Sequence, residues 1–350
     1  MTKLQGELDA LEAPLLVTNL TNVRYLTGFS GSNAQLLVTA GGARFMTDGR
    51  YRARAGELVK NAEISIYSNR LTDVLEPALT KAGISRLAVE SKSMTLAERD
   101  DLAGRLGKVE LVAAKGPVED LRRIKEPAEV AALRAAIALG DETYSHVLDR
   151  LQPGVSEREI ALELEVHMRT NGADEVSFEP IVGSGPLSAH IHHTPSERRF
   201  EKGDFVLLDF GARVDGYCGD LTRTVVLGSP SEEQQRQYDA VLAANTGALA
   251  AMKPGAECRA VDAVARRTVG EAGYDDFGHG LGHGVGLEVH ESPRFNRISE
   301  DVLAPGMVMT NEPGLYLERP GGVRIEDCVL ITETGAEVLT HSPRDMLTIV

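Results

Sequence analysis

The chain has 350 residues, 42% of them hydrophobic and 25% charged, which is the ordinary composition of a soluble globular protein. That length exceeds what one hydrophobic core usually serves, so we expect two domains. The net charge of −15 repels phosphate backbones and anionic membrane surfaces, so nucleic acid and membranes are not expected partners. The three cysteines are far apart and form no Cys-x-x-Cys pair, which argues against a thiolate zinc site or a disulfide scaffold.

The N-terminus is polar and acidic before its first apolar stretch. It lacks the basic start and the long apolar core of a signal peptide, and no apolar run approaches the length of a membrane span. We therefore expect a cytoplasmic protein.

The N-terminal part of the chain alternates short apolar segments with segments of helical pattern. This alternation predicts an α/β domain with a central sheet. No His, Cys or acidic residues cluster there, so we expect no site made by this domain alone. The predicted strands are Leu15–Val17, Gln35–Thr39, Arg44–Met46 and Leu87–Glu90, and the predicted helices are 69–82 and 95–105.

A polar stretch, 113–126, leads into a predicted long helix. Pro127 suits the first turn of that helix, and Glu129 follows it there. We place the domain boundary near residue 120, which gives domains of residues 1–120 and 121–350.

The second domain is predicted to be internally duplicated. Pro153-Gly154 recurs as Pro254-Gly255, 101 residues later, and Gly172 recurs as Gly273 at the same offset. A long predicted helix precedes each Pro-Gly (128–150 and 232–252), and a shorter one follows it. Pro-Gly between helices is common, so chance is the alternative. Duplication is favoured because Asp209 and Glu312 keep nearly the same offset.

A β-hairpin is predicted around Asp215-Gly216, the preferred pair for a two-residue type I′ turn. In that register Asp209 and Asp220 project from the same face of the hairpin. Two such carboxylates repel each other, so a cation is expected between them. The alternative is an exposed hairpin, but Leu207 shares the face of Asp209 and argues for burial.

The segment Gly278–Gly286 contains His279 and His283 among five alternate glycines. Each glycine costs a helix about 1 kcal/mol relative to alanine, so an extended strand with both histidines on one face is expected. No Glu follows the first His, which excludes a His-Glu-x-x-His protease, and no Gly-x-x-x-x-Gly-Lys pattern supports nucleotide binding.

Four carboxylates and one imidazole form the candidate metal site. Such a set suits two divalent cations that share bridging carboxylates, with Mn²⁺, Co²⁺ and Zn²⁺ all compatible. A hydroxide held between two cations can attack a carbonyl, so we expect a metal-dependent hydrolase. The five residues are Asp209, Asp220, His283, Glu312 and Glu326.

The chain resembles the pita-bread metallopeptidases, and among them the Xaa-Pro peptidases, prolidase and aminopeptidase P. The resemblance rests on LLDFGARVDGYCGDLTRT, HGLGHGVGLEVHESP, TNEPGLY and GGVRIED, and on NVRYLTGFSGSNA and FMTDGRY near the N-terminus. It implies a creatinase-like α/β domain followed by a duplicated α-α-β pita-bread catalytic domain of α+β type, and a homodimer. Methionine aminopeptidases fit less well because they lack the leading domain.

The resemblance also assigns roles to individual residues. It implies that the five candidates bind two metals, with Asp220 and Glu326 bridging, and that Glu312 is the acid/base residue. His279, His290 and Arg324 match residues that bind substrate or stabilise the transition state, and His192 matches a substrate-contacting histidine. Ile191 stands where many relatives have Pro, and the adjacent His193 leaves open which imidazole faces the substrate.

The expected reaction is hydrolysis of an Xaa-Pro bond in a short peptide by a metal-bridging hydroxide, with Mn²⁺ as the first choice of metal. Arg294 resembles the arginine with which prolidases bind the free Pro carboxylate, which favours a dipeptidase. If Arg294 is instead an ordinary surface residue, aminopeptidase P is the alternative. A non-catalytic pita-bread binding module and creatinase, which cleaves a non-peptide C–N bond, fit less well because both lack the full ligand set.

Overall fold

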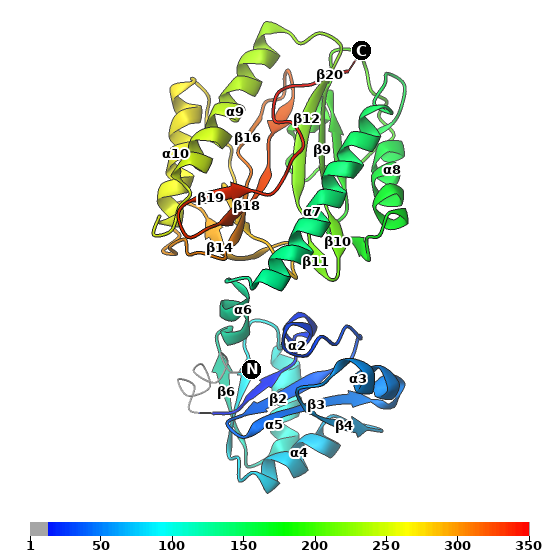
Figure 1. The fold of residues 1–350 in the computed structure, drawn as a ribbon, viewed down its shortest axis with the longest axis vertical. Coiled ribbons are helices and arrows are strands. Elements are labelled where there is room, and N and C mark those ends of the chain that lie inside the picture. The colour runs from blue at the N-terminus through cyan, green and yellow to red at the C-terminus, as the bar shows by residue number, and fades with distance from the viewer. Residues whose placement is uncertain (1–12, 350) are drawn as a thin grey trace. The chain divides into compact units, whose positions relative to one another are not determined.

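The computed structural model describes residues 13–349 and divides into two units (Figure 1). The first unit ends at Arg122 and the second begins at Arg123. None of the helices in the described part of the chain is long and apolar enough to cross a membrane. The three cysteines, all within that part, are free and buried.

The N-terminal unit is an α/β structure with one six-stranded mixed sheet, in the order β4-β3-β2-β1-β5-β6. Strand β1 is fully buried and runs parallel to β5 and antiparallel to β2. The strands are β1 (Leu15–Val17), β2 (Gln35–Thr39), β3 (Gly42–Asp48), β4 (Glu63–Tyr67), β5 (Arg86–Glu90) and β6 (Glu110–Ala114). The helices are α2 (Leu20–Thr27), η1 (Gly49–Tyr51), α3 (Arg52–Leu58), α4 (Thr72–Lys81), α5 (Leu96–Leu106) and α6 (Pro117–Arg122).

The predicted elements of this unit are confirmed, with ends that shift by a few residues. The prediction missed α2, α3, the two edge strands β4 and β6, and the short α6. Local capping accounts for α2, because the Asn19 side chain accepts hydrogen bonds from the backbone N–H groups of Thr21 and Asn22. Gly28 ends the helix with a φ of +77°, a conformation that favours glycine.

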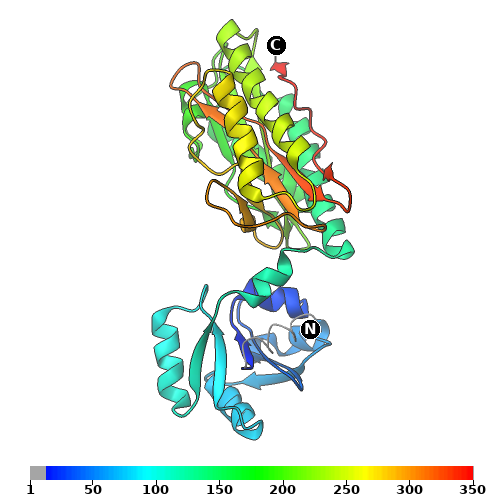
Figure 2. The same ribbon diagram turned by 90° about the vertical axis from the view of Figure 1, so that its left-hand side faces the viewer.

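The C-terminal unit contains two similar helix pairs. The first is α7 (Pro127–Leu148) with α8 (Glu157–Thr170), and the second is α9 (Glu232–Ala251) with α10 (Cys258–Glu271). Figures 1 and 2 both show α9 and α10 side by side. Between the helices of each pair, Gly154 and Gly255 have φ values of +96° and +82°, so both turns require glycine.

Strands follow each helix pair, so each half has the predicted α-α-β order. The first half contains β7 (Glu175–Val176), β8 (Ile181–Ser184), η2 (Gly185–Ala189), β9 (Phe205–Phe210), β10 (Ala212–Val214), β11 (Tyr217–Cys218) and β12 (Leu221–Leu227). The second contains β13 (Gly282–Gly284), β14 (Glu291–Phe295), β15 (Val308–Asn311), β16 (Gly314–Tyr316), β17 (Gly322–Arg324), β18 (Asp327–Ile331), β19 (Ala336–Val338) and β20 (Thr348–Ile349). The larger sheets have the orders β20-β12-β9-β8 and β14-β13-β15-β18-β19, and the smaller sheets are β11-β10-β7 and β16-β17.

The helix pairs bury the outer faces of these sheets. Val241 of α9 and Val261 of α10 belong to one core cluster with Met309 and Val329 of the second-half sheet. Full burial of each such side chain contributes roughly 1.5–3 kcal/mol. Every residue of β9 and β12 is buried, so polar side chains on these strands must find partners inside the protein.

Candidate metal and active site

The predicted carboxylate hairpin is present in the predicted register. Val214 pairs with Tyr217 across a turn whose central residues, Asp215 and Gly216, have φ values of +49° and +78°. In a neighbouring sheet, strands β9 and β12 continue the same register, and Asp209 pairs with Thr222. Asp209 and Asp220 are both buried and both line a cavity of about 470 Å³.

The glycine-histidine segment is extended over a shorter stretch than predicted. Only β13 is a strand, and His279 precedes it, although both His279 and His283 line the cavity. A Cβ at Gly282 would lie 2.2 Å from the carbonyl oxygen of Thr310 on β15. Glycine here is therefore required by the close approach of two strands.

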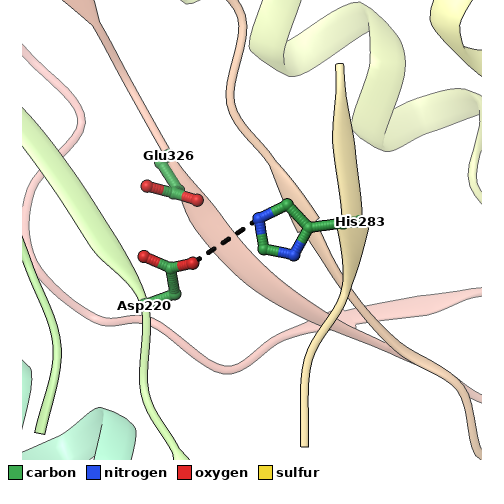
Figure 3. Close-up of side chains that lie close together, drawn as sticks. All are labelled: Asp220, His283 and Glu326. Carbon is green, nitrogen blue, oxygen red and sulfur yellow. Dashed lines mark ion pairs between the residues drawn. The ribbon is translucent and has the colours of Figure 1, made fainter. Parts of the chain in front are cut away.

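Asp220, His283 and Glu326 converge in this cavity (Figure 3). Each offers one ligand atom, and these atoms lie within 4.8 Å of one another. His283 Nδ1 lies 3.0 Å from the carbonyl oxygen of Gly284, where it can only donate. The other ring nitrogen, Nε2, lies 3.7 Å from Asp220 Oδ2 and 3.3 Å from Glu312 Oε1.

The carboxylates of this group repel one another. Burial and the charges of Glu326 and Asp209 raise the pKa of Asp220 well above its usual value. Burial and the charges of Glu312 and Asp209 do the same to the pKa of Glu326. The pKa of Glu312 is lowered instead, because the contact with His283 outweighs burial. Full ionisation of these carboxylates is therefore unfavourable unless a cation offsets their charge.

Arg324 and Tyr316 form one wall of the site. Arg324 makes an ion pair with Asp209 and donates to the Tyr316 hydroxyl at 2.9 Å. The same hydroxyl lies 2.8 Å from His279 Nε2. Burial raises the pKa of Tyr316 to about 12, so the phenol keeps its proton near neutral pH and can donate it to that ring nitrogen.

Three residues that the sequence analysis did not single out support this site. Thr222 Oγ1 donates to Glu326 Oε2 at 2.6 Å, and Thr310 Oγ1 lies 3.3 Å from Glu312 Oε1. The third is Tyr316. Strand alternation was the available signal for both threonines, because each lies two residues from a carboxylate. Nothing local marks Tyr316, whose partner Arg324 comes from the adjacent strand β17.

The remaining predicted residues lie around the same cavity. His192, His290 and Arg294 all line it, as do the apolar side chains of Phe178, Ile181, Ile191 and Val289. The His290 ring lies 4.5 Å from that of His283, edge to face. His193 is turned away, with Nε2 2.8 Å from Glu157 Oε2. Of the two adjacent histidines, His192 is therefore the one at the cavity.

The donor set fits divalent cations. Asp209 Oδ1 is buried and has no hydrogen-bond partner among the described residues, although its other oxygen pairs with Arg324. Nε2 of His283 faces the carboxylates of Asp220 and Glu312, and the pKa values of Asp220 and Glu326 are raised. Oxygen-rich donors with one imidazole suit Mn²⁺, Co²⁺ or Zn²⁺.

Comparison with known proteins agrees with this chemistry. Residues 131–333 match metallopeptidase family M24, and residues 2–124 match the creatinase/prolidase N-terminal domain. An Xaa-Pro dipeptidase of Pyrococcus horikoshii is 36% identical over 342 residues, which cover 97% of this chain and 95% of that protein.

Two solved structures are similar over almost their whole length. An Xaa-Pro dipeptidase from Bacillus anthracis has a TM-score of 0.97 at 38% identity and covers 99% of this chain and 98% of its own. An X-Pro aminopeptidase from Thermotoga maritima has a TM-score of 0.90 at 34% identity, with coverage of 96% and 97%. The chain therefore belongs to metallopeptidase family M24, carries a creatinase-type N-terminal domain and a pita-bread catalytic domain, and is a metal-dependent hydrolase.

Proposed function

We propose that this protein is an Xaa-Pro dipeptidase, a prolidase. The observation that carries the proposal is the convergence of Asp220, His283 and Glu326 in a cavity that also contains Arg294. A volume of about 470 Å³ suits a small ligand such as a dipeptide. The dipeptidases of Pyrococcus horikoshii and Bacillus anthracis support the same substrate class.

Two divalent cations, with Mn²⁺ as the first choice, complete the proposed site. Asp209, Asp220, His283, Glu312 and Glu326 would hold them. When bound, such cations activate a water molecule as nucleophile and polarise the carbonyl of the scissile bond.

The side chains around that centre have separate proposed tasks. Glu312 accepts the proton of the attacking water and passes it to the nitrogen of the leaving Pro. His290, whose pKa is lowered by burial and by His283, donates a hydrogen bond to the oxygen that gains charge. Arg324, through Tyr316, holds His279 against the substrate.

The preference for Pro has a physical basis. The nitrogen of an Xaa-Pro bond carries no hydrogen. A peptidase that binds its substrates through the N–H of the scissile bond therefore binds Xaa-Pro peptides poorly. Here the apolar side chains of Phe178, Ile181 and Val289 offer packing surface in its place. His192 at the cavity is proposed to contact the substrate directly.

Arg294 separates the proposed dipeptidase from the alternative, an aminopeptidase P that acts on longer peptides. A guanidinium in the cavity can bind the free Pro carboxylate of a dipeptide through two hydrogen bonds. The X-Pro aminopeptidase of Thermotoga maritima keeps the alternative open.

The test compares Leu-Pro, Leu-Pro-Ala and Leu-Ala as substrates of protein reconstituted with one metal at a time. Faster cleavage of Leu-Pro supports the dipeptidase, and faster cleavage of Leu-Pro-Ala supports aminopeptidase P. A protein that binds no stoichiometric metal and cleaves none of the three would be a binding module instead. A cytoplasmic location and a homodimer remain predictions, which fractionation and light scattering would test.

A further inference from the structure

The segment 190–195, which follows η2, places His192 at the cavity. The buried carboxylate of Glu157, which lies outside the cavity, holds this segment in place. The Glu157 side chain is 0% exposed and accepts five hydrogen bonds. Its Oε1 accepts from the backbone N–H (2.8 Å) and the hydroxyl (2.7 Å) of Ser184. Its Oε2 contacts the backbone N–H (3.0 Å) and hydroxyl (2.6 Å) of Ser196 and Nε2 of His193 (2.8 Å).

These contacts fix the segment on both sides of His192. Ser184 lies at the end of β8, before the segment, and Ser196 lies after it. The backbone N–H of Glu157 also donates to the carbonyl of Arg198, at 3.1 Å. Because Glu157 is the first residue of α8, one rigid helix end anchors the whole segment.

His193 is the partner of Glu157 that directly follows His192 in the chain. Its side chain is 10% exposed, and its backbone N–H donates to the carbonyl of His190 at 3.1 Å, which closes a turn. With the His193 ring directed at Glu157, its neighbour His192 is exposed and lines the cavity. The position of one imidazole therefore sets the position of the other.

The anchor is ionised. Burial alone would raise the pKa of Glu157, but the hydrogen bonds from Ser196, His193 and Ser184 outweigh it and lower the pKa. A charged acceptor makes each of these hydrogen bonds stronger than a neutral one would be.

We propose that Glu157 and His193 are positioning residues that hold His192 at the substrate cavity. Neither residue of the pair lines the cavity, so we expect the pair to act only through His192. The inference rests on the proposed Xaa-Pro dipeptidase function, in which His192 contacts the substrate.

Two substitutions at His193 test the pair. His193→Phe keeps a ring and removes the nitrogen that contacts Glu157, whereas His193→Gln keeps an N–H donor. Losing one hydrogen bond to a buried charge should raise KM for Leu-Pro about 10-fold, with kcat changed less than about 3-fold. His193→Gln should restore KM to within about 3-fold of wild type, and His341→Phe, at an exposed histidine, is the matched control.

The double variant His193→Phe/His192→Ala tests whether His193 positions His192 or has only a general structural role. If His193 acts through His192, His193→Phe should cause no further loss of kcat/KM in the His192→Ala background. An equal loss in both backgrounds, or a failure of His193→Gln to restore KM, would overturn the proposal.

Hydrogen exchange provides a readout that needs no activity. His193→Phe and Glu157→Gln should both speed exchange of the backbone amides of 186–199, while the bound metal per subunit stays unchanged. Unchanged exchange would overturn the proposed anchor. If wild-type protein cleaves no Xaa-Pro peptide, the dipeptidase proposal fails, and the exchange experiment still decides whether the pair holds the segment.

Discussion

Asp209 and Arg324 form a buried ion pair although 115 residues separate them in the sequence. Asp209 lies on β9 in the first half of the C-terminal unit, and Arg324 lies on β17 in the second half. The pair joins the two halves at the wall of the cavity. It leaves the second oxygen of Asp209 without a partner among the described side chains and therefore available to a cation.

Arg324→Gln should destabilise the metal-free protein strongly. It leaves the Asp209 carboxylate buried without its cation, which costs about 3–5 kcal/mol. Urea unfolding in the presence of a chelator measures the change. Arg134→Gln is the control, because its pair with Glu337 is exposed and should contribute at most about 1 kcal/mol. Equal effects of the two substitutions would show that the buried pair contributes no more to the free energy of unfolding than the exposed pair does.

Asp220→Asn should abolish turnover and yet stabilise the metal-free fold. The pKa of Asp220 is raised well above its usual value by burial and neighbouring carboxylates, so neutralising it removes repulsion. We expect a gain of about 1–2 kcal/mol in the free energy of unfolding without metal, because active-site residues often lower the stability of the fold that holds them. Calorimetric titration with Mn²⁺ should show weakened metal binding. A variant that retains normal turnover would remove Asp220 from the proposed ligand set.

Arg294→Ala should impair only substrates with a free Pro carboxylate. Losing a bidentate contact with a carboxylate should lower kcat/KM for Leu-Pro by about 10–100-fold. The C-terminal amide of the same dipeptide lacks that charge, so its kcat/KM should change little. Arg297→Ala provides a nearby exposed arginine as control. If both substrates lose activity equally, Arg294 does not recognise the carboxylate.

Glu157→Gln should change how stability depends on pH. The pKa of Glu157 in the folded protein lies below its ordinary value of 4.5, so the unfolded state binds more protons between the two values. The stabilisation is therefore complete above about pH 4.5 and is lost as pH falls through the lower, folded value. The stability difference between wild type and Glu157→Gln should shrink as pH is lowered from 7 toward 3. A stability difference that does not change with pH would contradict the lowered pKa of Glu157. The matched control is Glu76→Gln, at an exposed glutamate.

Several features were predictable because they depend on residues close together in the sequence. The turn at Asp215-Gly216 sets the register of the two strands. Because side chains alternate between the two faces of a strand, that register places Asp209 and Asp220 on one face. Pro127 in the first turn of α7 and the two Pro-Gly turns likewise indicated the helix pairs. Edge strands such as β4 and β6 were missed because their half-exposed sequences carry a weak hydrophobic pattern.

The sequence by itself determined the types of ligand and the local faces from which they project. Only the tertiary structure decided that His192 lines the cavity while His193 binds Glu157, and that Tyr316 joins Arg324 to His279. The physical reason is the distance along the sequence over which each interaction acts. Turn geometry and strand alternation act over a few residues, whereas these partners meet only when separate strands and helices pack together.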